Sequence, residues 1–511
     1  MTFHSILFDE PEAGDRAAAR EAPAFFSDLH LDWLVDAITS GREEYDLEPF
    51  FRLPLNDVDA IKHRQEVMRD IEDEECSRRL AAFTEGMTLV RRYLALSEKL
   101  QYKYHRKGWH LEAAETYCDT VVRLHRDLDP DRLRSRGLLD FCRYLKEHVE
   151  SNGFATLFRE TKKLKSDLAA VKYCILIRDN AVKVRRYEGE VDYSREVEQA
   201  FEKFKQGAVK DYRAKLPHGT GMNHVEAQIL DLVAKLHPGV FASLDGFCAR
   251  HEQFRDETIV VFDREIQFYI AYLEHISMMK SSGLSFCYPA VSRQTKEVYS
   301  RDGFDLALAT KCVNEKTPVV CNDFHLSGRE RILVVSGPNQ GGKTTFSRTF
   351  GQLHYLGCLG LPVPGREAQL FLFDRLFTHF EREEDIRNLR GKLQDDLVRI
   401  HDILDQATGD SILIMNEIFS STTLQDAVYL GGKIMEKIVG LDLLCVWVTF
   451  IDEIAAADER VVSMMATVVP DDPASRTFKI LRRPADGLAY AMSIAERYRL
   501  TYAGVKERMK S

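Results

Sequence analysis

Long hydrophobic runs are missing from this chain of 511 residues. No stretch approaches the roughly 18 consecutive apolar residues that suggest a membrane-spanning helix. The first 24 residues also lack the positive end and the apolar stretch of a secretion signal, and they carry Asp9, Glu10, Glu12 and Asp15 instead. We therefore expect a cytoplasmic protein with no membrane partner.

Closely paired cysteines are missing as well. The ten cysteines stand at positions 76, 118, 142, 174, 248, 287, 312, 321, 358 and 445, without a CxxC pair or another metal-ligand spacing. Scattered cysteines of this kind are typical of reduced thiols in a cytosolic protein.

An excess of positive charge is the third absence. The chain has 70 lysines and arginines against 80 aspartates and glutamates, which gives a formal net charge of −10. No domain-wide basic field therefore indicates nucleic acid, and any DNA contact must come from local patches. Hydrophobic residues make up 45% and charged residues 29% of the chain, so most of it is expected to fold.

The length predicts two to four domains, and the character of the sequence changes near residue 290. Residues 1–26 form a tail, residues 27–290 are mainly helical in pattern, and residues 291–511 alternate short β-type runs with helical stretches. The helical pattern begins with apolar residues on one helix face, at Leu29, Leu31, Leu34, Val35 and Ile38.

One β-type segment interrupts the helical part. The runs Tyr173–Ile177 and Val182–Tyr187 flank Asp179-Asn180, which is a turn signal, and together they predict a hairpin. The hairpin belongs to an insertion that spans about residues 171–225.

Residues 291–511 are expected to form an α/β domain. Three short apolar runs have the length and composition of buried parallel strands, namely Ile332–Val335, Ile412–Met415 and Leu444–Val448. Helical stretches separate these runs, as a parallel sheet requires.

A phosphate-binding loop follows the first of these runs, because residues 337–344 fit the pattern GxxxxGK[ST]. The loop consists of Gly337, Pro338, Asn339, Gln340, Gly341, Gly342, Lys343 and Thr344, and Thr345 follows it. Glycines let backbone N–H groups curl around a phosphate, and the next helix adds its positive N-terminal dipole. Lys343 is expected to reach the β- and γ-phosphates and Thr344 to ligate Mg²⁺. ATP and Mg²⁺ are therefore the expected cofactors.

Asn416 and Glu417 end the second apolar run, where such a site carries its carboxylates. In a typical site an aspartate at the first position holds the metal shell, and the next glutamate orients the attacking water. Asn416 offers a neutral carbonyl oxygen, which adds no charge against the phosphates. We expect Glu417 to be catalytic, Thr344 and Asn416 to face the metal, and turnover to be slow. The alternative is that Glu417 is a surface residue at a strand end.

The loop sequence resembles one family in particular. Residues 337–345 are similar to the GPNxGGKST loop of the MutS mismatch-repair ATPases, and Asn339 is part of that match. Further segments resemble family elements in the same order, at Cys321–Phe324, Tyr355–Gly357, Val363-Pro364, Phe373–Thr378, Asn416–Ile418, Thr422–Asp426 and Asp486-Gly487. The resemblance covers roughly residues 295–505 and implies an ABC-type, MutS-like P-loop ATPase domain.

The helical part resembles the family more faintly. Residues 53–57 look like the start of the MutS core or lever domain, and the helix–hairpin–helix order of residues 171–279 is similar to its clamp insertion. No room precedes these residues for the mismatch-reading and connector domains of the family, and no Phe-x-Glu wedge stands near the start. The resemblance therefore implies a shortened member that is not a wedge-type mismatch reader.

The resemblance also implies a homodimer, because the family's ATPase sandwiches each nucleotide against a signature segment of the partner. The matching segment here is Glu384–Leu393, which retains Asp385 and Arg390 but has Gly391 in place of the serine. Phe450 stands where the family has a histidine that senses the γ-phosphate. With Asn416, three contacts to the γ-phosphate and metal are altered, so we expect binding to be kept and hydrolysis to be weakened.

Basic residues of the predicted hairpin are the candidate DNA contacts. If the hairpin is the tip of a clamp, Lys183, Arg185 and Arg186 can rest on backbone phosphates without reading sequence. The alternative is a solvated strand edge, where lysine discourages edge pairing.

We therefore expect an ATP-dependent DNA-binding protein of the MutS type, a dimeric nucleotide-gated clamp in DNA repair or recombination. The main alternative is an ATP-binding scaffold with negligible hydrolysis that holds a protein partner without DNA. The negative net charge and the altered contacts favour that alternative. A small-molecule kinase is a weaker third possibility, because no acceptor-substrate lid is evident.

Overall fold

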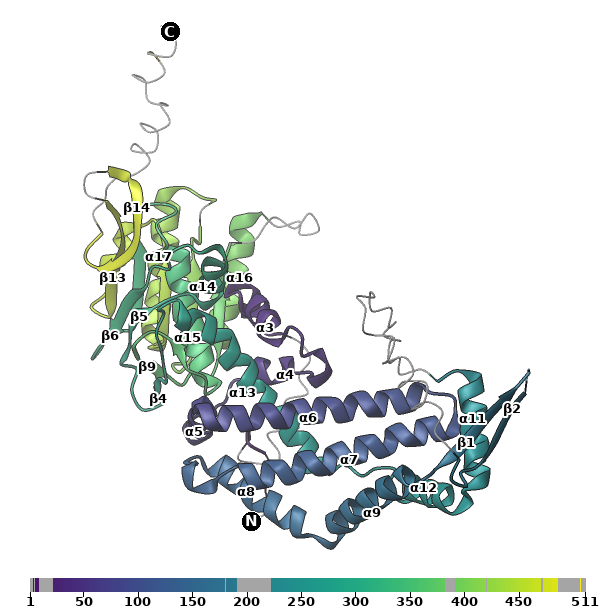
Figure 1. Cartoon of the computed structure of the whole chain (residues 1–511). Helices are drawn as coiled ribbons and strands as arrows, with labels where there is room; N and C mark the ends of the chain where they lie inside the picture. Colours follow the sequence, from purple (N-terminus) through teal and green to yellow (C-terminus); the bar gives the residue numbers. More distant parts are fainter. Residues whose placement is uncertain are drawn as a thin grey trace, which may run out of the picture. The chain divides into compact units, whose positions relative to one another are not determined.

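The chain forms two compact units in a computed structural model that describes residues 3, 5–8, 22–179, 181–190, 222–381, 391–419, 421–469, 472–485 and 506. The first, here called the helical unit, comprises residues 1–3, 73–133 and 139–263. The second, the sheet unit, comprises residues 4–72, 134–138 and 264–511. Figure 1 labels the elements of both units.

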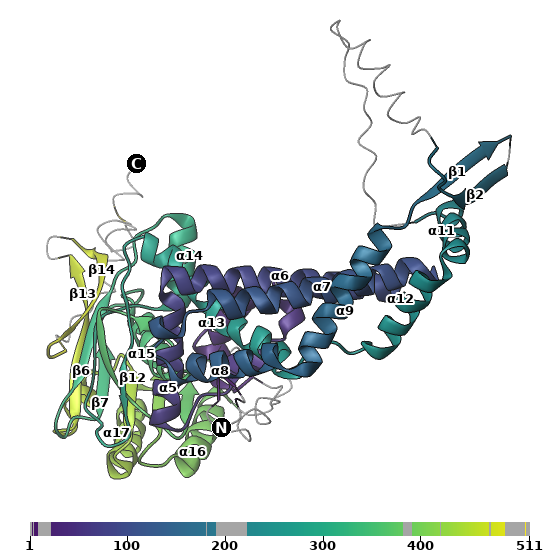
Figure 2. The ribbon, with the colours of Figure 1, turned by 60° about the horizontal axis from the view of Figure 1, so that its bottom comes forward.

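The helical unit contains two long helices, α6 (Glu74–Lys99) and α7 (Lys103–Asp127). They run side by side in Figures 1 and 2. Gly86 permits their close approach, because a Cβ atom on it would lie 2.3 Å from Oγ1 of Thr120. The remaining elements of this unit are η2 (Pro130–Arg132), most of α8 (Arg136–Glu150), α9 (Asn152–Ala169), α11 (His224–Leu236), α12 (Pro238–Arg250) and the start of α13 (Glu257–Ser281).

Side-chain caps fix where these helices begin. The carboxylate of Asp73 accepts hydrogen bonds from the backbone N–H groups of Glu75 and Cys76 at the start of α6. Asn223 and Glu226 form a reciprocal capping box at the start of α11. Each cap satisfies N–H groups that have no partner within the helix itself.

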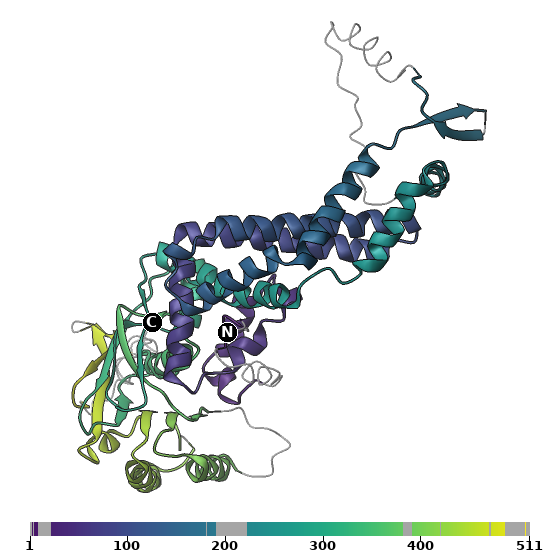
Figure 3. The same cartoon turned by 90° about the horizontal axis from the view of Figure 1, so that it is seen from below.

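The predicted hairpin is present in the helical unit. Strands β1 (Tyr173–Arg178) and β2 (Ala181–Arg186) pair antiparallel, with Tyr173 opposite Arg186 and Arg178 opposite Ala181. Figure 3 shows the two arrows beyond the ends of the helices of this unit. Residues 191–221 of the predicted insertion lie outside the described residues.

The sheet unit is organised around a six-stranded sheet with the order β10-β11-β12-β7-β13-β14. The pairs from β10 to β13 are parallel, and β14 is antiparallel to β13. The strands are β7 (Ile332–Ser336), β10 (Leu376–His379), β11 (Ile412–Asn416), β12 (Leu444–Val448), β13 (Val461–Val469) and β14 (Asp472–Arg482). The three apolar runs predicted as parallel strands are β7, β11 and β12, so the α/β prediction is confirmed.

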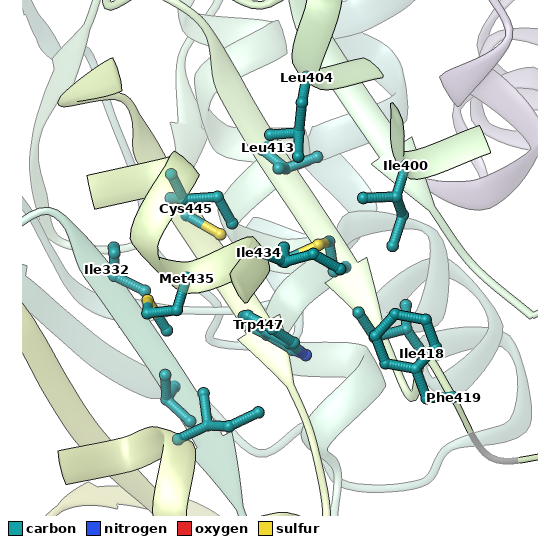
Figure 4. Packing of buried hydrophobic residues seen from close by; sticks show 14 of the residues in the cluster. Ile332, Ile400, Leu404, Leu413, Ile418, Phe419, Ile434, Met435, Cys445 and Trp447 are labelled. Carbon is teal, nitrogen blue, oxygen red and sulfur yellow. The ribbon is translucent and has the colours of Figure 1, made fainter. Parts of the chain in front are cut away.

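Helices cover both faces of this sheet. On one face, α16 (Lys392–Gln406) and α17 (Leu424–Leu441) pack on the alternate residues Leu413, Met415 and Trp447, which belong to one buried cluster (Figure 4). On the other face lies α15 (Lys343–Cys358), where a Cβ atom on Gly351 would lie 2.7 Å from Cδ1 of Ile414. Burial on both faces explains why these strands are continuous apolar runs.

Smaller elements complete the sheet unit. A four-stranded sheet has the order β4-β9-β5-β6, and β3 pairs with β8. These strands are β3 (Phe286–Cys287), β4 (Ala290–Ser292), β5 (Val298–Gly303), β6 (Asn322–Leu326), β8 (Val363–Pro364) and β9 (Glu367–Phe371). The further helices are α2 (Phe25–Asp28), α3 (Leu31–Thr39), η1 (Glu43–Tyr45), α4 (Glu48–Arg52), α5 (Val58–Glu72), α14 (Leu306–Glu315) and η3 (Asp452–Ala456).

Residues 5–8, within the predicted tail, are anchored in the sheet unit. The backbone N–H of Ile6 donates to Oε2 of Glu265 at 2.8 Å, and the hydroxyl of Ser5 donates to Oε1 of the same carboxylate. The hydroxyl of Tyr269 donates to the carbonyl oxygen of Ile6 at 2.7 Å. Burial raises the pKa of Glu265 to about 7, against the opposing effects of the hydrogen bonds from Ser5 and Ile6.

The compact units divide the chain differently from the predicted domains. Residues 27–72 belong to the sheet unit, although their sequence pattern groups them with the helical part. A helical pattern reports local structure, whereas tertiary packing decides where each apolar face is buried. The domain limits at 26 and 290 therefore stay a prediction. Among the described residues, no helix combines the length and apolar character that crossing a membrane requires.

Candidate nucleotide-binding site

The carboxyl ends of three adjacent strands define the candidate site. Strand β7 leads into the loop at residues 337–342, β11 ends at Asn416 and is followed by Glu417, and β12 is followed by Thr449 and Phe450. Because β11, β12 and β7 are parallel neighbours, these segments meet at one edge of the sheet. The backbone confirms this arrangement, since Glu417 N–H donates to Val448 O at 2.9 Å and Thr449 N–H to Val335 O at 3.0 Å.

The loop has the strained, glycine-dependent geometry that phosphate binding requires. Gly337 has a φ of 110°, and a Cβ atom on it would lie 2.9 Å from the carbonyl oxygen of Ala466. Gln340 and Gly342 also have positive φ, at 60° and 90°. Helix α15 begins at Lys343, so its N-terminal N–H groups and positive dipole end at the loop.

Lys343 is held inside the loop that it follows. Its Nζ donates to the carbonyl oxygen of Gly337 at 2.9 Å and to Oδ1 of Asn339 at 3.3 Å, and it lies 3.5 Å from Oε1 of Glu417. Burial lowers the pKa of Lys343, the Glu417 carboxylate opposes that effect, and the nearby Arg476 guanidinium lowers the pKa further. These loop acceptors hold the ammonium group inside the loop.

The structure brings Thr344 and Asn416 together. The Thr344 hydroxyl donates to Oδ1 of Asn416 at 2.9 Å, and Asn416 is only 9% exposed. Oxygen donors of this kind suit Mg²⁺, so both side chains fit as its ligands by chemistry and position. Neither carries a negative charge, however, so this pair offers the metal weaker electrostatic attraction than a threonine with an aspartate.

Glu417 lies directly beside this pair and is partly accessible. Its backbone adopts a left-handed conformation with a φ of 52°, and Phe419 does the same at 63°. Such conformations are costly for residues other than glycine and occur most often at functional sites. The side chain of Glu417 is 33% exposed, so its carboxylate is accessible to water as well as to Lys343.

Of the two other altered positions, Phe450 follows β12 at this edge, and Gly391 precedes α16. Gly391 is the N-cap of α16 and has an ordinary φ of −66°. Phe450 follows the buried Thr449 and is 47% exposed. Asp385 and Arg390 of the predicted signature segment lie outside the described residues.

Arg476 is a residue of the site that the sequence did not reveal. It lies on β14, and its Nε donates to the carbonyl oxygen of Asn339 in the loop at 3.1 Å. The sequence carried no signal for it, because β14 has no motif and its approach to the loop depends on sheet topology. The structure thus adds a second cationic side chain to the loop that holds Lys343.

Asn322 fixes β14 beside the loop. Its Nδ2 donates to the carbonyl oxygen of Phe478 at 3.1 Å, and its Oδ1 accepts from the N–H of Ile480 at 2.8 Å. A Cβ atom on Gly342 would lie 3.6 Å from the same carbonyl oxygen of Phe478. Asn322 belongs to the segment that resembles a family element upstream of the loop, and here it has a structural role.

The hairpin residues are in the helical unit and have unequal surroundings. Arg186 donates from Nη2 to the carbonyl oxygen of Leu236, the last residue of α11, at 2.8 Å. Arg185 lies 2.6 Å from the carboxylate of Glu190. Lys183 stands opposite Leu176 on the same face of the hairpin as Arg185, and it is exposed. Of the three predicted DNA contacts, Arg185 and Arg186 thus hold groups of the helical unit, whereas Lys183 is exposed on the hairpin.

Comparison with known proteins shows the following similarities. Residues 333–501 match the family model described as MutS domain V. The protein named DNA mismatch repair protein MutS from Thermotoga maritima is 24% identical over 250 residues, which cover 48% of this chain and 30% of that protein. The protein of the same name from Thermotoga sp. strain RQ2 is 24% identical over 220 residues, which cover 42% of this chain and 27% of that protein. The matched region thus spans less than a third of the length of either relative.

Proposed function

We propose that this chain, whose residues 333–501 match the model of MutS domain V, is an ATP-binding protein of the MutS type whose nucleotide site controls the attachment of its helical unit to DNA. The single observation that carries the proposal is the loop of residues 337–344, closed around Lys343 at the N-terminus of α15. ATP is the proposed nucleotide and Mg²⁺ the proposed metal, with Thr344 and Asn416 as its protein ligands.

Binding follows from the positions of the loop groups. The N–H groups of residues 339–345 and the helix dipole attract a polyphosphate, and Lys343 supplies a buried positive charge. The Gly337 carbonyl and the Asn339 side chain now accept from Lys343, and a bound phosphate would take their place as its partner. When bound, Mg²⁺ supplies charge neutralisation at the β- and γ-phosphates.

Hydrolysis is proposed to be slow. Glu417 is the proposed residue that orients the attacking water, and its accessible carboxylate 3.5 Å from Nζ of Lys343 supports that role. Asn416 contributes no charge. Gly391 lacks the hydroxyl group of the family's serine, and Phe450 lacks the imidazole group of the family's histidine. Positioned charges and donors at a transferring phosphoryl group are each worth several kcal/mol, so losing three is expected to slow turnover by several decades.

The helical unit is the proposed DNA-contacting part, and a homodimer is the proposed assembly. The exposed Lys183 on the hairpin supports an electrostatic contact with phosphates. The alternative, an ATP-binding scaffold that holds a protein partner without DNA, is favoured by the apolar face of the hairpin. Ile175 and Ile177 of that face are 42% and 77% exposed.

One experiment tests the proposal and its alternative together. Purified chain is assayed for ATP binding, phosphate release and ATP-sensitive retention on duplex, mismatched and branched DNA, with Lys343→Ala as the matched control. We expect ATP binding that Lys343→Ala abolishes, slow phosphate release that Glu417→Ala abolishes, and nucleotide-dependent retention on DNA. Nucleotide binding without retention on any of these DNA molecules would favour the scaffold. Absence of ATP binding would overturn both.

A further inference from the structure

The charge at the candidate site differs from that of a typical P-loop ATPase. The element after β11 contributes one carboxylate, Glu417, because Asn416 replaces the other. In a typical site the aspartate and the metal ion together neutralise the phosphates. A neutral amide attracts the metal ion less, so another group must neutralise the phosphates if binding is to stay tight.

Arg476 is placed to be that group. Its Nε donates to the carbonyl oxygen of Asn339 at 3.1 Å, while Oδ1 of the same Asn339 accepts from Nζ of Lys343 at 3.3 Å. One loop residue therefore holds two cationic side chains that come from different elements, β14 and α15. A guanidinium group suits phosphate well, because its planar donors form paired hydrogen bonds with phosphate oxygens.

The approach of β14 to the loop is fixed by several contacts. Asn322 bonds both the Phe478 carbonyl and the Ile480 N–H, and Phe478 adopts a left-handed φ of 58°. Such a conformation is costly for a residue with a side chain and persists only where surrounding contacts enforce it. The position of Arg476, two residues before Phe478, is therefore imposed by the fold.

The Arg476 guanidinium helps to lower the pKa of Lys343, so the two cations repel each other. Like charges that are partly removed from water cost free energy unless an anion lies between or beside them. Lys343 has Glu417 at 3.5 Å, but that carboxylate is the proposed water-orienting group. A polyphosphate carries several negative charges and would favour both cations at once.

On the basis of the proposed function, we propose that Arg476 is a further phosphate-binding residue, and that its guanidinium takes over part of the charge neutralisation that Mg²⁺ provides in a typical P-loop site. ATP binding by this chain is then retained when Mg²⁺ is removed. The dependence on metal returns when Asn416 is replaced by aspartate.

The test measures the dissociation constant of ATP for the full chain in MgCl₂ and in EDTA. The variants are Arg476→Ala, Arg476→Lys, Asn416→Asp and the control Arg329→Ala. Arg329 carries the same charge and pairs with Glu459, and it lies before the start of β7, at the opposite end of that strand from the loop. Thermal unfolding of each variant shows that it is folded, and binding of adenosine separates phosphate contacts from base contacts.

The expected result has three parts. Wild-type affinity in EDTA stays within about 3-fold of that in MgCl₂, and Arg476→Ala weakens ATP binding in EDTA about 10- to 100-fold, the range for a charge-assisted hydrogen bond. Arg476→Lys retains part of the affinity, and Arg329→Ala and adenosine binding are unchanged. Asn416→Asp binds ATP at least about 10-fold more tightly in MgCl₂ than in EDTA. A 10-fold change in affinity corresponds to about one hydrogen bond to a charged group.

Two other results separate failure of this inference from failure of the proposed function. If the wild-type chain binds ATP in MgCl₂ but loses it in EDTA, or if Arg476→Ala binds as the wild type does, the inference is wrong while the proposed function stands. If the wild-type chain binds ATP in neither condition, both are wrong.

Discussion

The Thr344 hydroxyl donates a hydrogen bond to the side-chain oxygen of Asn416 across 2.9 Å. Two neutral side chains therefore stand where a typical P-loop ATPase pairs its threonine with a carboxylate. An aspartate has nearly the same shape, so Asn416→Asp adds a charge with little change in packing. We predict that this variant hydrolyses ATP about 10- to 100-fold faster, since each 1.4 kcal/mol of lowered barrier gives a factor of ten. Steady-state phosphate release at saturating ATP and MgCl₂ measures the effect.

The double variant Asn416→Asp, Glu417→Gln is the matched control for that gain. It keeps the added charge but removes the proposed water-orienting carboxylate, so it should release phosphate no faster than the wild type. A double variant as fast as Asn416→Asp alone would show that Glu417 is not the catalytic residue.

The hairpin offers a prediction about DNA affinity. Lys183→Glu removes a cation from the exposed face of β2, whereas Arg186 holds the carbonyl of Leu236 and is unsuitable for such a test. We expect Lys183→Glu to weaken DNA binding and to reduce the slope of log affinity against log salt concentration by about one. Fluorescence anisotropy of labelled duplex at several salt concentrations gives both quantities.

Lys163→Glu is the control for this experiment. Lys163 is exposed on α9 of the same unit, so its reversal changes the net charge of that unit by the same amount. Equal losses of affinity in the two variants would indicate a general charge effect and would reject the hairpin as a specific contact.

Two glycines of the helical unit predict opposite changes in stability. Gly86 of α6 faces Thr120 of α7, and an added methyl group would lie 2.3 Å from its Oγ1, so the Thr120 side chain or the helices must shift. We expect Gly86→Ala to lower the free energy of unfolding by about 1–3 kcal/mol, the usual cost of overpacking. Gly108 of α7 has nothing within 4 Å of such a methyl group, and Gly108→Ala should raise stability by up to about 1 kcal/mol.

Urea unfolding followed by circular dichroism compares these two variants with the wild type. Because both add one methyl group to a helix, helix propensity alone predicts the same sign for both. A Gly86→Ala protein at least as stable as the wild type would contradict the close approach of α6 and α7.

The buried carboxylate that anchors residues 5–8 predicts a pH dependence of stability. Burial raises the pKa of Glu265 to about 7, so the folded state holds its proton more tightly than the unfolded state does. This contribution is fully present below the unfolded pKa of about 4.5 and is lost as the pH rises to about 7, by at most about 3 kcal/mol. The groups around the carboxylate are the Ser5 hydroxyl, the Ile6 N–H, Tyr269 and Arg64. Arg64 stays charged between pH 4.5 and pH 7 because its pKa is about 10.

Glu265→Gln removes this titration and keeps the shape of the side chain. The difference in unfolding free energy between wild type and variant, measured from pH 5 to pH 8, should therefore move in favour of the variant as the pH rises. A difference that stays constant over this range would mean that Glu265 is ionised in the folded chain.

The sequence predicted local structure and the loop well, because both depend on residues close together in the chain. The apolar face of α3, the hairpin and the strands β7, β11 and β12 follow from periodicity and turn residues. Arg476 and Asn322 were not recognised as partners of the loop, since their positions depend on the order of strands in a sheet. The anchoring of residues 5–8 by Glu265 was missed for a similar reason, because it joins residues about 260 positions apart.

The central claim is that this chain keeps ATP bound and hydrolyses it slowly, and a single-turnover experiment tests it most directly. Excess protein is mixed with radiolabelled ATP and MgCl₂, and the bound and hydrolysed fractions are followed together over time, with Lys343→Ala as the control. Median enzymes turn over about 10 times per second, and the loss of several decades predicts nucleotide that stays bound as ATP for minutes. Nucleotide that does not bind, that binds equally to Lys343→Ala, or that is hydrolysed within seconds would contradict the claim.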